Sequence, residues 1–359
     1  MAKFLEVFED VTKLGTKVPT DEYLDSGEYP IIDQGQAFIS GYRNDETGLF
    51  TDVPAIIFGD HTRVLKYVDM PCFLGADGVK LLKSKDKTAD YKYLYYALCN
   101  AKIPNTGYNR HFKWLKEIDI FIPDVDTQHI IAANLDKVTH TIDLCNAILE
   151  KLDLLVKSRF VEMFGDPITN SHKLPIKTLS ELGELGRGVS KHRPRNAPEL
   201  LGGVYPLIQT GDVANASLYI IEYNSTYSEI GYKQSKMWNK GTLCITIAAN
   251  IAKTAILTFD SCFPDSVVGF NSNESTNNIF IHFWFSFFQE LLEEQAPESA
   301  QKNINLKILS ELKVIVPPIE LQEQFAAFVE QTDKSKLAVK QVLEKAETLK
   351  KALMQEYFR

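Results

Sequence analysis

The chain of 359 residues carries 39 lysines and arginines against 47 aspartates and glutamates, which gives a formal net charge of −8. Hydrophobic residues make up 45% and charged residues 24% of the chain, a composition typical of a folded globular protein and not of a disordered one. The acidic balance excludes a nucleic-acid binder that acts through overall positive charge. Any DNA contact must therefore depend on local basic patches or on a partner that supplies positive charge.

The five cysteines form no C-x-x-C pair and are odd in number, which indicates a reduced, cytoplasmic protein and not a disulfide framework. The densest apolar run, residues 279–288, is too short to span a bilayer and contains His282. We therefore predict a buried helix there and no association with a membrane.

Residues 1–125 are predicted to form the first globular domain. They combine a Y-P-I-I segment at 29–32, a β-branched and aromatic run at 55–58, a C-F pair at 72–73 before a helical stretch, and a last strand at 118–122. Short strands mixed with one or two helices predict an α+β domain with a substantial sheet.

Residues 126–166 are predicted to form a long helix, which ends at Gly165 because Pro167 prevents its continuation. The apolar residues of this segment recur at an unbroken alternating spacing of four and three residues, the pattern of a two-helix coiled coil. This seam consists of Ile131, Leu135, Val138, Ile142, Cys145, Leu149, Leu152 and Val156.

Residues 167–318 repeat the plan of the first domain. A Y-P-L-I segment lies at 205–208, a β-branched run at 242–247, a C-F pair at 262–263 and a last strand at 312–316. We predict a second α+β domain. The two domains resemble each other less than the two helices do, as expected if they bind different targets.

Residues 319–359 are predicted to form a second long helix that repeats the first. Gln128 aligns with Gln322 and Phe164 with Phe358, a constant offset of 194 residues without a gap, which indicates a duplicated unit. The same seam register recurs with three polar positions, and a further apolar stripe is predicted to widen the buried face. The seam consists of Phe325, Val329, Thr332, Lys336, Val339, Leu343, Ala346, Lys350 and Leu353, and the stripe of Phe328, Val342 and Leu349.

Connectivity sets the direction of the two helices. The first leads from the first domain to the second, so a paired second helix must run back antiparallel and bring the two ends of the chain close together. At about 1.5 Å per residue, roughly 35 residues would hold the two domains roughly 50 Å apart. The predicted architecture is two globular domains joined by an antiparallel coiled coil, with pseudo-two-fold character.

The chain resembles a specificity (S) subunit of a type I restriction–modification system over essentially its whole length. The most specific stretches are S-K-H-R-P-R-N (190–196), Y-P-L-I-Q-T-G-D-V (205–213), K-G-T-L-C-I-T-I-A-A-N-I-A (240–252), C-F-P-D-S-V-V-G-F (262–270) and P-P-I-E-L-Q-E-Q (317–324). The form D-V-D-T-Q before the first helix departs from the P-P-x-E-x-Q pattern, and the first domain matches less specifically.

The resemblance implies a non-catalytic subunit that recognises double-stranded DNA. Each target-recognition domain would read one half of a bipartite site, and the helices would set the spacer. Two modification (methyltransferase) subunits would dock on the helices and hold S-adenosylmethionine, so this chain itself would need no cofactor. Restriction (endonuclease and translocase) subunits would complete the complex. Candidate docking residues on the helices are Phe160, Met163, Phe325 and Phe358.

Base reading needs Arg, Lys, Asn or Gln, and phosphate is held by basic, amide and hydroxyl groups. Polar loops near strand ends supply these side chains in both domains. In the first domain the predicted DNA-contacting residues are His61, Thr62, Arg63, Tyr108, Asn109, Arg110, His111 and Lys113. In the second they are Arg187, Lys191, His192, Arg193, Arg195, Gln209, Thr210, Lys233, Gln234, Lys236, Asn250, Lys253, Gln301, Lys302 and Asn303.

Two alternatives compete with DNA recognition. One is a metal-dependent nuclease that uses Asp265 with the distant Glu311 and Lys313, although the spacing is long and Asp265 more simply shapes a loop. The other is an assembly scaffold without DNA contact, which the acidic charge favours. The sequence contains neither a phosphate-binding G-x-x-x-x-G-K-[ST] loop nor an H-E-x-x-H motif, and its seven histidines lack metal-ligand spacing.

Overall fold

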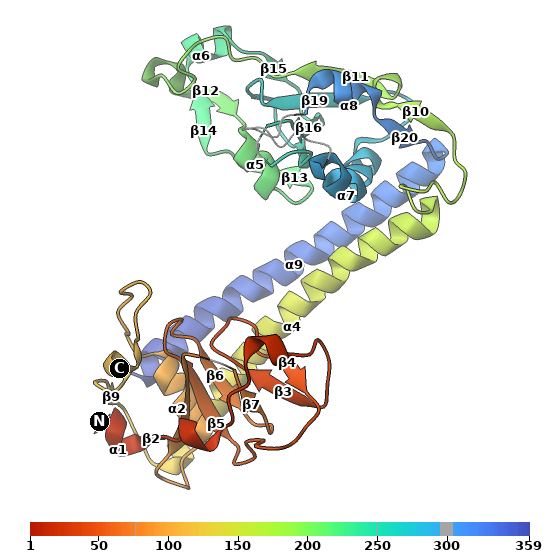
Figure 1. The fold of residues 1–359 in the computed structure, drawn as a ribbon. Coiled ribbons are helices and arrows are strands. Elements are labelled where there is room, and N and C mark those ends of the chain that lie inside the picture. Colours follow the sequence, from red (N-terminus) through yellow and green to blue (C-terminus); the bar gives the residue numbers. More distant parts are fainter. Residues whose placement is uncertain (76, 249, 295–303) are drawn as a thin grey trace. The chain divides into compact units, whose positions relative to one another are not determined.

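A computed structural model describes residues 1–75, 77–248, 250–294 and 304–359 (Figure 1). The chain divides into two compact units. Unit 1 comprises Met1–Ala147 with Lys340–Arg359, and unit 2 comprises Ile148–Val339. Each unit therefore contains one globular domain and a part of each long helix.

Unit 1 contains a four-stranded antiparallel sheet in the order β2-β8-β5-β6, a three-stranded sheet in the order β4-β3-β7, and the short pair β1-β9. The strands are β1 (Ala2–Lys3), β2 (Phe8–Asp10), β3 (Tyr29–Ile32), β4 (Gly41–Arg43), β5 (Ala55–Gly59), β6 (Leu65–Val68), β7 (Phe73–Leu74), β8 (Val79–Ser84) and β9 (Asp119–Ile120). The short helices are α1 (Phe4–Val7), η1 (Thr12–Leu14), η2 (Thr20–Glu22), α2 (Tyr91–Cys99) and α3 (Phe112–Leu115).

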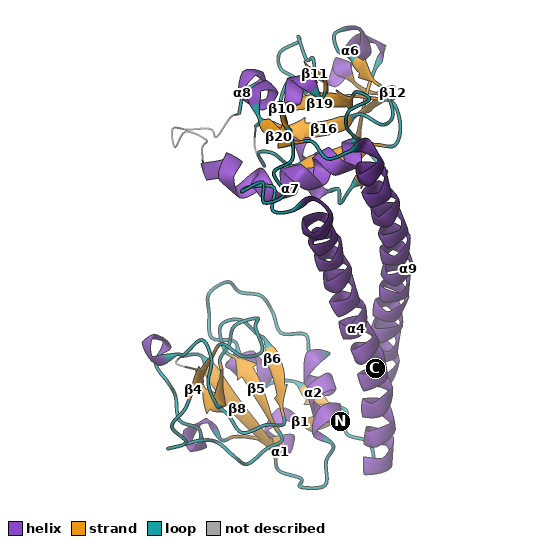
Figure 2. Cartoon of the chain, turned by 90° about the vertical axis from the view of Figure 1, so that its right-hand side faces the viewer, coloured by secondary structure: helices purple, strands orange, loops and turns teal. Residues whose placement is uncertain are grey.

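The central strand β5 is buried on both faces because its side chains alternate between two cores. Ile56 and Phe58 belong to a core shared with α2, whereas Ala55 and Ile57 belong to a core shared with β7 and β8. Alternation with a period of two sends successive side chains to opposite faces of a sheet. The apolar run predicted at 55–58 is therefore a strand covered on both sides, with α2 lying along the sheet (Figure 2).

Unit 2 repeats this plan with added elements. Its sheets have the orders β11-β19-β16-β17-β13 and β14-β12-β18-β15, with the pair β10-β20. The strands are β10 (Ile176–Thr178), β11 (Gly183–Arg187), β12 (Leu201–Leu207), β13 (Tyr219–Ile220), β14 (Ser225–Tyr227), β15 (Met237–Trp238), β16 (Leu243–Thr246), β17 (Thr254–Leu257), β18 (Ser261–Cys262), β19 (Val267–Ser272) and β20 (Lys313–Ile315). The helices are η3 (Leu179–Glu181), η4 (Pro198–Leu200), α5 (Thr210–Asn215), α6 (Glu229–Lys233), α7 (Asn278–Glu294) and α8 (Leu306–Glu311).

The strand orders establish which elements correspond in the two units. Strands β2, β8, β5 and β6 occupy the places of β11, β19, β16 and β17, and helix α2 that of α7. The α+β class and the duplicated plan predicted from the sequence are confirmed.

The two long helices are α4 (Val125–Phe164) and α9 (Ile319–Tyr357). Every predicted seam position of both helices is buried or half-buried. In unit 2, Lys336 Nζ lies 2.7 Å from Asp153 Oδ1, while the rings of Phe325 and Phe160 have centroids 5.4 Å apart. Since later residues of α4 contact earlier residues of α9, the pairing is antiparallel as predicted. The polar seam residue Lys336 is accommodated by its ion pair.

The end of α9 packs in unit 1, which also contains the start of the chain (Figure 1). The Phe358 ring lies 5.4 Å from that of Tyr93 on α2, and Asn100 Nδ2 donates a hydrogen bond of 3.3 Å to the Phe358 carbonyl. The equivalent contact in unit 2 joins Phe164 at the end of α4 to Phe280 on α7, at 5.1 Å. The predicted return of the second helix to the first domain is confirmed.

Two predictions for the helix surfaces are wrong. Phe328 is half-buried, but Val342 and Leu349 of the second stripe are 48% and 49% exposed, so the stripe does not widen the buried face. Among the candidate docking residues, Phe160 and Phe325 have no exposed surface. The remaining two, Met163 and Phe358, are partly buried against the cores of units 2 and 1. The docking prediction is therefore wrong for Phe160 and Phe325, whereas Met163 and Phe358 keep part of their surface exposed.

Helix α7 confirms the buried helix predicted around residues 279–288. Phe280, Ile281 and Phe285 have no exposed surface, and Trp284 has 1%. Among the helices of the described residues, none is long and apolar enough to cross a membrane.

Burial of His282 on α7 makes the stability of unit 2 depend on pH. Burial, with a smaller contribution from Lys336, lowers the pKa of His282 to about 4, while Thr254 Oγ1 lies 2.9 Å from its Nδ1. An unfolded histidine has a pKa near 6.5, so between these values the unfolded state binds more protons. The free energy of unfolding should fall by about 3 kcal/mol as the pH drops through this range.

Urea titrations at neutral pH and near pH 5 would measure this effect. The variant His282→Gln should lose most of the dependence, whereas His140→Gln at an exposed position of α4 should keep it. An unchanged pH dependence in His282→Gln would contradict the assignment.

Candidate nucleic-acid interface

One end of the four-stranded sheet in unit 1 brings together several polar loops. Strands β2 and β5 both run antiparallel to β8, so their ends lie beside the start of β8. The pairing of Gly59 with Val79 places the predicted turn at 59–63 next to the loop that precedes β8. Backbone hydrogen bonds join these two loops, since the Asp60 N–H donates to the Gly78 carbonyl at 2.6 Å.

The turn at 59–63 contacts the loop at 106–111, which the sequence separates by more than forty residues. The carbonyl of Asp60 accepts the N–H of His111 at 2.7 Å, and its Oδ1 accepts the N–H of Phe112 at 2.7 Å. The ring of Tyr108 stacks on His61 with centroids 4.7 Å apart and planes at 8°. Tyr108 is nevertheless 88% exposed, so this stack presents an aromatic face to solvent.

His111 is not available for DNA contact. Its side chain has no exposed surface, and its Nδ1 lies 3.0 Å from the Asp60 carbonyl. The prediction of His111 as a DNA-contacting residue is therefore contradicted, because this ring anchors the loop that carries its neighbours. The other predicted residues of the loop, Tyr108, Asn109 and Arg110, are exposed.

The other predicted residues of unit 1 have mixed roles. Thr62 Oγ1 donates to the carbonyl of Gln34 at 2.6 Å, and Arg63 has a positive φ of 63° with its Nη1 3.4 Å from the Ile103 carbonyl. Thr62 and Arg63 thus help to shape the turn. Lys113 is exposed, and its ammonium lies over the ring of Trp114 at 4.1 Å.

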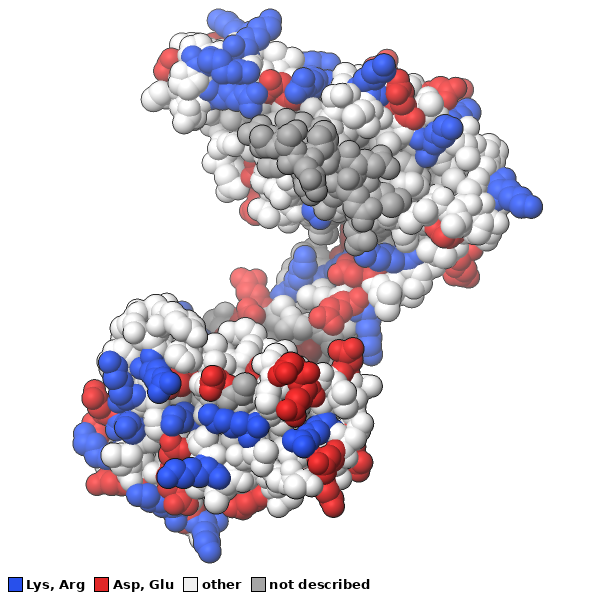
Figure 3. Space-filling model, in the orientation of Figure 1, with Lys and Arg blue, Asp and Glu red and all other residues white. Residues whose placement is uncertain are grey.

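A group of lysines at this end of the sheet was missed by the sequence reasoning. Lys13, Lys17 and Lys80 line a pocket of about 430 Å³ together with Asp10, Thr12 and Gly15. Among the described residues, neither Lys13 nor Lys17 has a carboxylate within ion-pair distance, whereas Lys80 Nζ lies 3.1 Å from Asp10 Oδ2. We call Lys13, Lys17 and Lys80 the lysine cluster. Basic side chains gather across the face of unit 1 seen in Figure 3.

The pKa of Asp10 reflects its burial and its place beside Thr12 and Lys80. Burial acts to raise the pKa of Asp10, but hydrogen bonds from Thr12 and the ammonium of Lys80 outweigh it and hold the pKa below its usual value.

The position of these lysines in the repeated plan is the signal that could have predicted the lysine cluster. Residues 12–17 follow β2 as the basic loop at 190–196 follows β11, and these two strands correspond.

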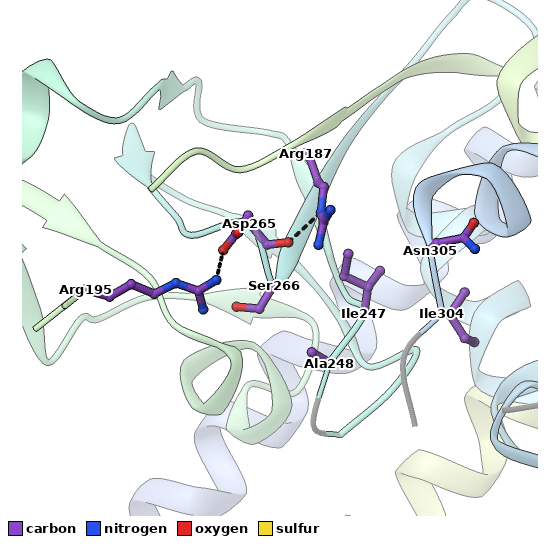
Figure 4. Close-up of a pocket in the computed structure, with 8 residues that line it drawn as sticks. All are labelled: Arg187, Arg195, Ile247, Ala248, Asp265, Ser266, Ile304 and Asn305. Atoms are coloured by element: carbon purple, nitrogen blue, oxygen red, sulfur yellow. Dashed lines mark hydrogen bonds and ion pairs between the residues drawn. The ribbon is translucent and has the colours of Figure 1, made fainter. Parts of the chain in front are cut away.

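The corresponding end of the sheet in unit 2 forms a pocket of about 220 Å³ (Figure 4). Arg187 is the last residue of β11, and Asp265 and Ser266 directly precede β19. The loop after β16 and the segment before α8 complete the pocket. Its lining residues are Arg187, Arg195, Ile247, Ala248, Asp265, Ser266, Ile304 and Asn305.

Asp265 binds three arginines at the mouth of this pocket. Its carbonyl accepts the Nε–H of Arg187 at 2.7 Å, and its carboxylate pairs with Arg195 (Figure 4). The carboxylate also lies 3.5 Å from Arg193. These contacts agree with the loop-shaping role that the sequence favours for Asp265.

Within the described part of the chain, no group of three or more His, Cys, Asp or Glu side chains could hold a metal ion.

Gln234 orders the basic loop at 190–196. Its Oε1 accepts the backbone N–H groups of Lys191 and His192 at 2.6 and 3.0 Å, so this predicted DNA contact has an internal function. The side chain of Lys191 is exposed, while His192 Nε2 lies 3.8 Å from Glu199.

The two neighbouring lysines, Lys233 and Lys236, are exposed near this loop. Lys233 pairs with Glu229 at 3.5 Å, and the Lys236 ammonium lies 3.9 Å from the ring centroid of Trp238. Lysine and arginine side chains gather at the end of unit 2 that carries α6 and β15 (Figure 3).

The remaining predicted residues of unit 2 are dispersed. Gln209 is exposed and caps α5, because its N–H donates to Asp212 Oδ2 at 2.8 Å; Thr210 begins that helix. Asn250 is exposed with a positive φ of 45°, but Lys253 Nζ binds Gln289 Oε1 on α7 at 2.9 Å. The predicted residues Gln301, Lys302 and Asn303 lie outside the described residues.

One backbone hydrogen bond recurs at corresponding places in the two units. The N–H of Ile304, before α8, donates to the carbonyl of Ile247 at 3.1 Å. This bond of unit 2 corresponds to the bond in unit 1 from the N–H of His111, before α3, to the carbonyl of Asp60. In both units a backbone bond therefore joins the segment before a short helix to the loop after the central strand.

Comparison with known proteins gives one family. The type I restriction modification DNA specificity domain matches residues 4–154 and 175–348. The chain is 23% identical over 254 residues to the specificity subunit of the type I restriction enzyme EcoR124I/EcoR124II of Escherichia coli, a match that covers 68% of this chain and 62% of that protein. The chain thus spans less than two thirds of that relative's length.

A second relative is the putative type I restriction enzyme MjaX specificity subunit of Methanocaldococcus jannaschii, 22% identical over 316 residues, with 81% of this chain and 73% of that protein covered. Among solved structures, the S subunit of a type I restriction-modification system from M. genitalium has the same fold. Its TM-score is 0.66 at 18% identity, and the match covers 99% of this chain and 95% of that one.

Proposed function

Because the chain belongs to the type I restriction modification DNA specificity family, we propose that it is the DNA-recognition subunit of a type I restriction–modification complex. Each unit reads one half of a bipartite site in double-stranded DNA. The observation that carries this proposal is the same in both units: basic side chains gather at one end of the sheet, beside polar loops. In unit 1 the neighbouring loop also presents the ring of Tyr108. In a chain of net charge −8, direct contacts with DNA depend on such local concentrations of basic side chains.

The two kinds of side chain suit different parts of DNA. Lys13 and Lys17 in unit 1 and Lys191 in unit 2 are point charges suited to phosphate. Asn109 and Arg110 offer the paired donors and acceptors that distinguish bases in the major groove. Phosphate contacts position a protein on DNA, and base contacts specify the sequence.

The chain contributes recognition, and other subunits contribute chemistry. In this proposal two modification subunits dock on the long helices and hold S-adenosylmethionine, and restriction subunits join the same complex. The helices offer apolar side chains outside the seam, among them Leu144, Leu154, Leu155 and Leu337, which are 49–63% exposed. Such residues on a paired helix support docking of a protein partner better than a solvent-facing role.

Selection from random duplexes tests this function. The purified chain, with and without its co-expressed modification subunit, is incubated with the duplex pool, and bound DNA is sequenced. We expect two short half-sites at a fixed spacer, enriched strongly only with the partner present, because the acidic chain alone binds DNA weakly. A stable protein complex without any enrichment would favour the assembly scaffold instead.

Arg110 and Lys191 should respond differently to replacement by alanine. Arg110→Ala is expected to weaken binding to the selected site by about tenfold or more with little change on random DNA, because base contacts carry specificity. Lys191→Ala should weaken both equally and reduce the salt slope by about one, because its contact is with phosphate. Titrations on both DNAs at several salt concentrations measure this. Equal losses on both DNAs for Arg110→Ala would contradict its base-reading role.

A further inference from the structure

Each unit contains a buried glutamine near the start of its long helix, and the two glutamines make corresponding contacts. Gln128 near the start of α4 is 1% exposed, and Gln322 near the start of α9 has no exposed surface. The side-chain Nε2 of each donates to a proline carbonyl five residues earlier, Pro123 or Pro317, at 2.9 Å. We call this contact set the glutamine bridge.

The other side of each amide binds the recognition domain. Gln128 Oε1 accepts the N–H of Asp90 at 3.0 Å, and Gln322 Oε1 accepts the N–H of Asn277 at 3.1 Å. Asp90 and Asn277 directly precede α2 and α7, which correspond in the two units. Both also accept a helix N–H through their own side chains, at 2.8 Å from Lys92 and 2.7 Å from Ile279. One amide therefore joins the start of the domain's helix to the start of the long helix.

Hydrogen bonds fix this junction in a way that packing alone does not. Apolar contacts around the start of each long helix are non-directional, whereas a hydrogen bond weakens steeply when its angle changes. A buried amide that loses its partners also leaves them unpaired, which is unfavourable. The glutamine bridge thus favours one orientation of the domain on its helix.

We propose that Gln128 and Gln322 are positioning residues that set the orientation of each recognition domain on its long helix, and thereby the spacing of the two half-sites. This inference deepens the proposed function and rests on it for the DNA consequence. The structural part, a fixed angle between domain and helix within one unit, is independent of DNA.

The bridge is more extensive in unit 2. Gln322 Oε1 also accepts Thr276 Oγ1 at 3.0 Å, and its Nε2 also donates to the Ser275 carbonyl at 3.2 Å. Both amide hydrogens and both acceptor positions of Gln322 are therefore used, against two bonds for Gln128. Replacement of Gln322 should consequently have the larger effect of the two.

A distance measurement within unit 2 tests the structural part. Spin labels are placed at the exposed positions Asn239, in the recognition domain, and Lys334, on α9, in full-length chain carrying Cys99→Ser. The other four cysteines are buried. We expect Gln322→Met, which keeps the side-chain length and removes the hydrogen bonds, to broaden the distance distribution about twofold.

The matched control is Gln324→Met, at an exposed position two residues along the same helix. It should leave the distribution narrow. A distribution of unchanged width in Gln322→Met would overturn the positioning role. If Gln322→Met does not fold, Gln128→Met, with labels at exposed positions of unit 1, provides the same comparison.

Spacer selection in the assembled complex tests the DNA part. The wild-type complex should prefer its selected spacer over spacers longer or shorter by one base pair, and Gln322→Met should reduce that preference by about tenfold, with unchanged affinity for random duplex. Lower thermal stability with an unchanged spacer preference would show a merely structural residue and overturn the inference. If the wild-type complex selects no bipartite site, the proposed function fails, while the distance measurement still decides the positioning role.

Discussion

Replacement of Phe160 by alanine is expected to lower the free energy of unfolding by about 4 kcal/mol, a change that would unfold many domains of ordinary stability. Phe160, at the end of α4, has no exposed surface and lies between four aromatic rings. Its ring centroid is 5.0–5.4 Å from those of Phe164, Phe280, Phe287 and Phe325. The truncation would remove these contacts and leave a cavity between helices that come from distant parts of the sequence.

Chemical denaturation followed by tryptophan fluorescence measures this effect, because Trp238 and Trp284 both lie in unit 2. The control is Val161→Ala, one residue along the same helix and 40% exposed, which should change the free energy by about 0.5 kcal/mol or less. A loss below about 1 kcal/mol in Phe160→Ala would show that the end of α4 is not part of the core of unit 2.

The lysine cluster should dominate the salt dependence of DNA binding by unit 1. The double variant Lys13→Gln/Lys17→Gln removes two charges that have no acidic partner among the described residues. If both lysines contact phosphate, the plot of log affinity against log salt should become shallower by about 2, and the affinity at low salt should fall by tenfold or more, about equally on selected and random DNA. Lys80 is left in place because its loss would leave Asp10 unpaired.

The control variant Lys85→Gln/Lys87→Gln removes the same charge from the opposite end of β8. It should change the slope little, because those lysines follow the strand end that lies away from the loops. If both double variants reduce the slope equally, overall charge and not the lysine cluster sets the affinity. If neither does, the phosphate contacts of unit 1 lie elsewhere.

The acidic residues at both candidate interfaces explain how basic groups remain ordered before DNA binds. Asp10 pairs with Lys80 in unit 1, and the carboxylate of Asp265 pairs with Arg193 and Arg195 in unit 2. Phosphate would have to compete with these carboxylates. This agrees with the weak binding expected of the chain in the absence of its modification partner.

Several features followed from the sequence because they depend on local periodicity. The alternating spacing from Ile131 to Val156 predicted which side chains of α4 face α9, and every one is buried or half-buried. The constant offset between the two long helices predicted a repeated plan, which the strand orders confirm. Side-chain spacing along a helix depends only on helical geometry, so the pattern is readable without knowledge of distant contacts.

Individual loop residues could not be assigned in this way. His111 and Arg110 are neighbours in one polar loop, yet one is fully buried against Asp60 and the other is exposed. Gln234 resembled a base reader but accepts two backbone N–H groups of another loop. Outside regular elements no periodicity relates position in the chain to exposure, so burial is set by whichever segment packs against the loop.

The sequence by itself thus determined the duplicated architecture, the antiparallel helix pair and the family, because these are encoded in repeats and in heptad spacing. Only the tertiary structure decided which polar groups share a surface. The stack of Tyr108 on His61, the binding of three arginines by Asp265 and the lysine cluster all join residues from separate loops. Antiparallel pairing of β11 with β19 and of β2 with β8 brings together the strand ends that carry the arginine contacts and the lysine cluster. The stack of Tyr108 on His61 depends on the hydrogen bonds that join its loop to Asp60.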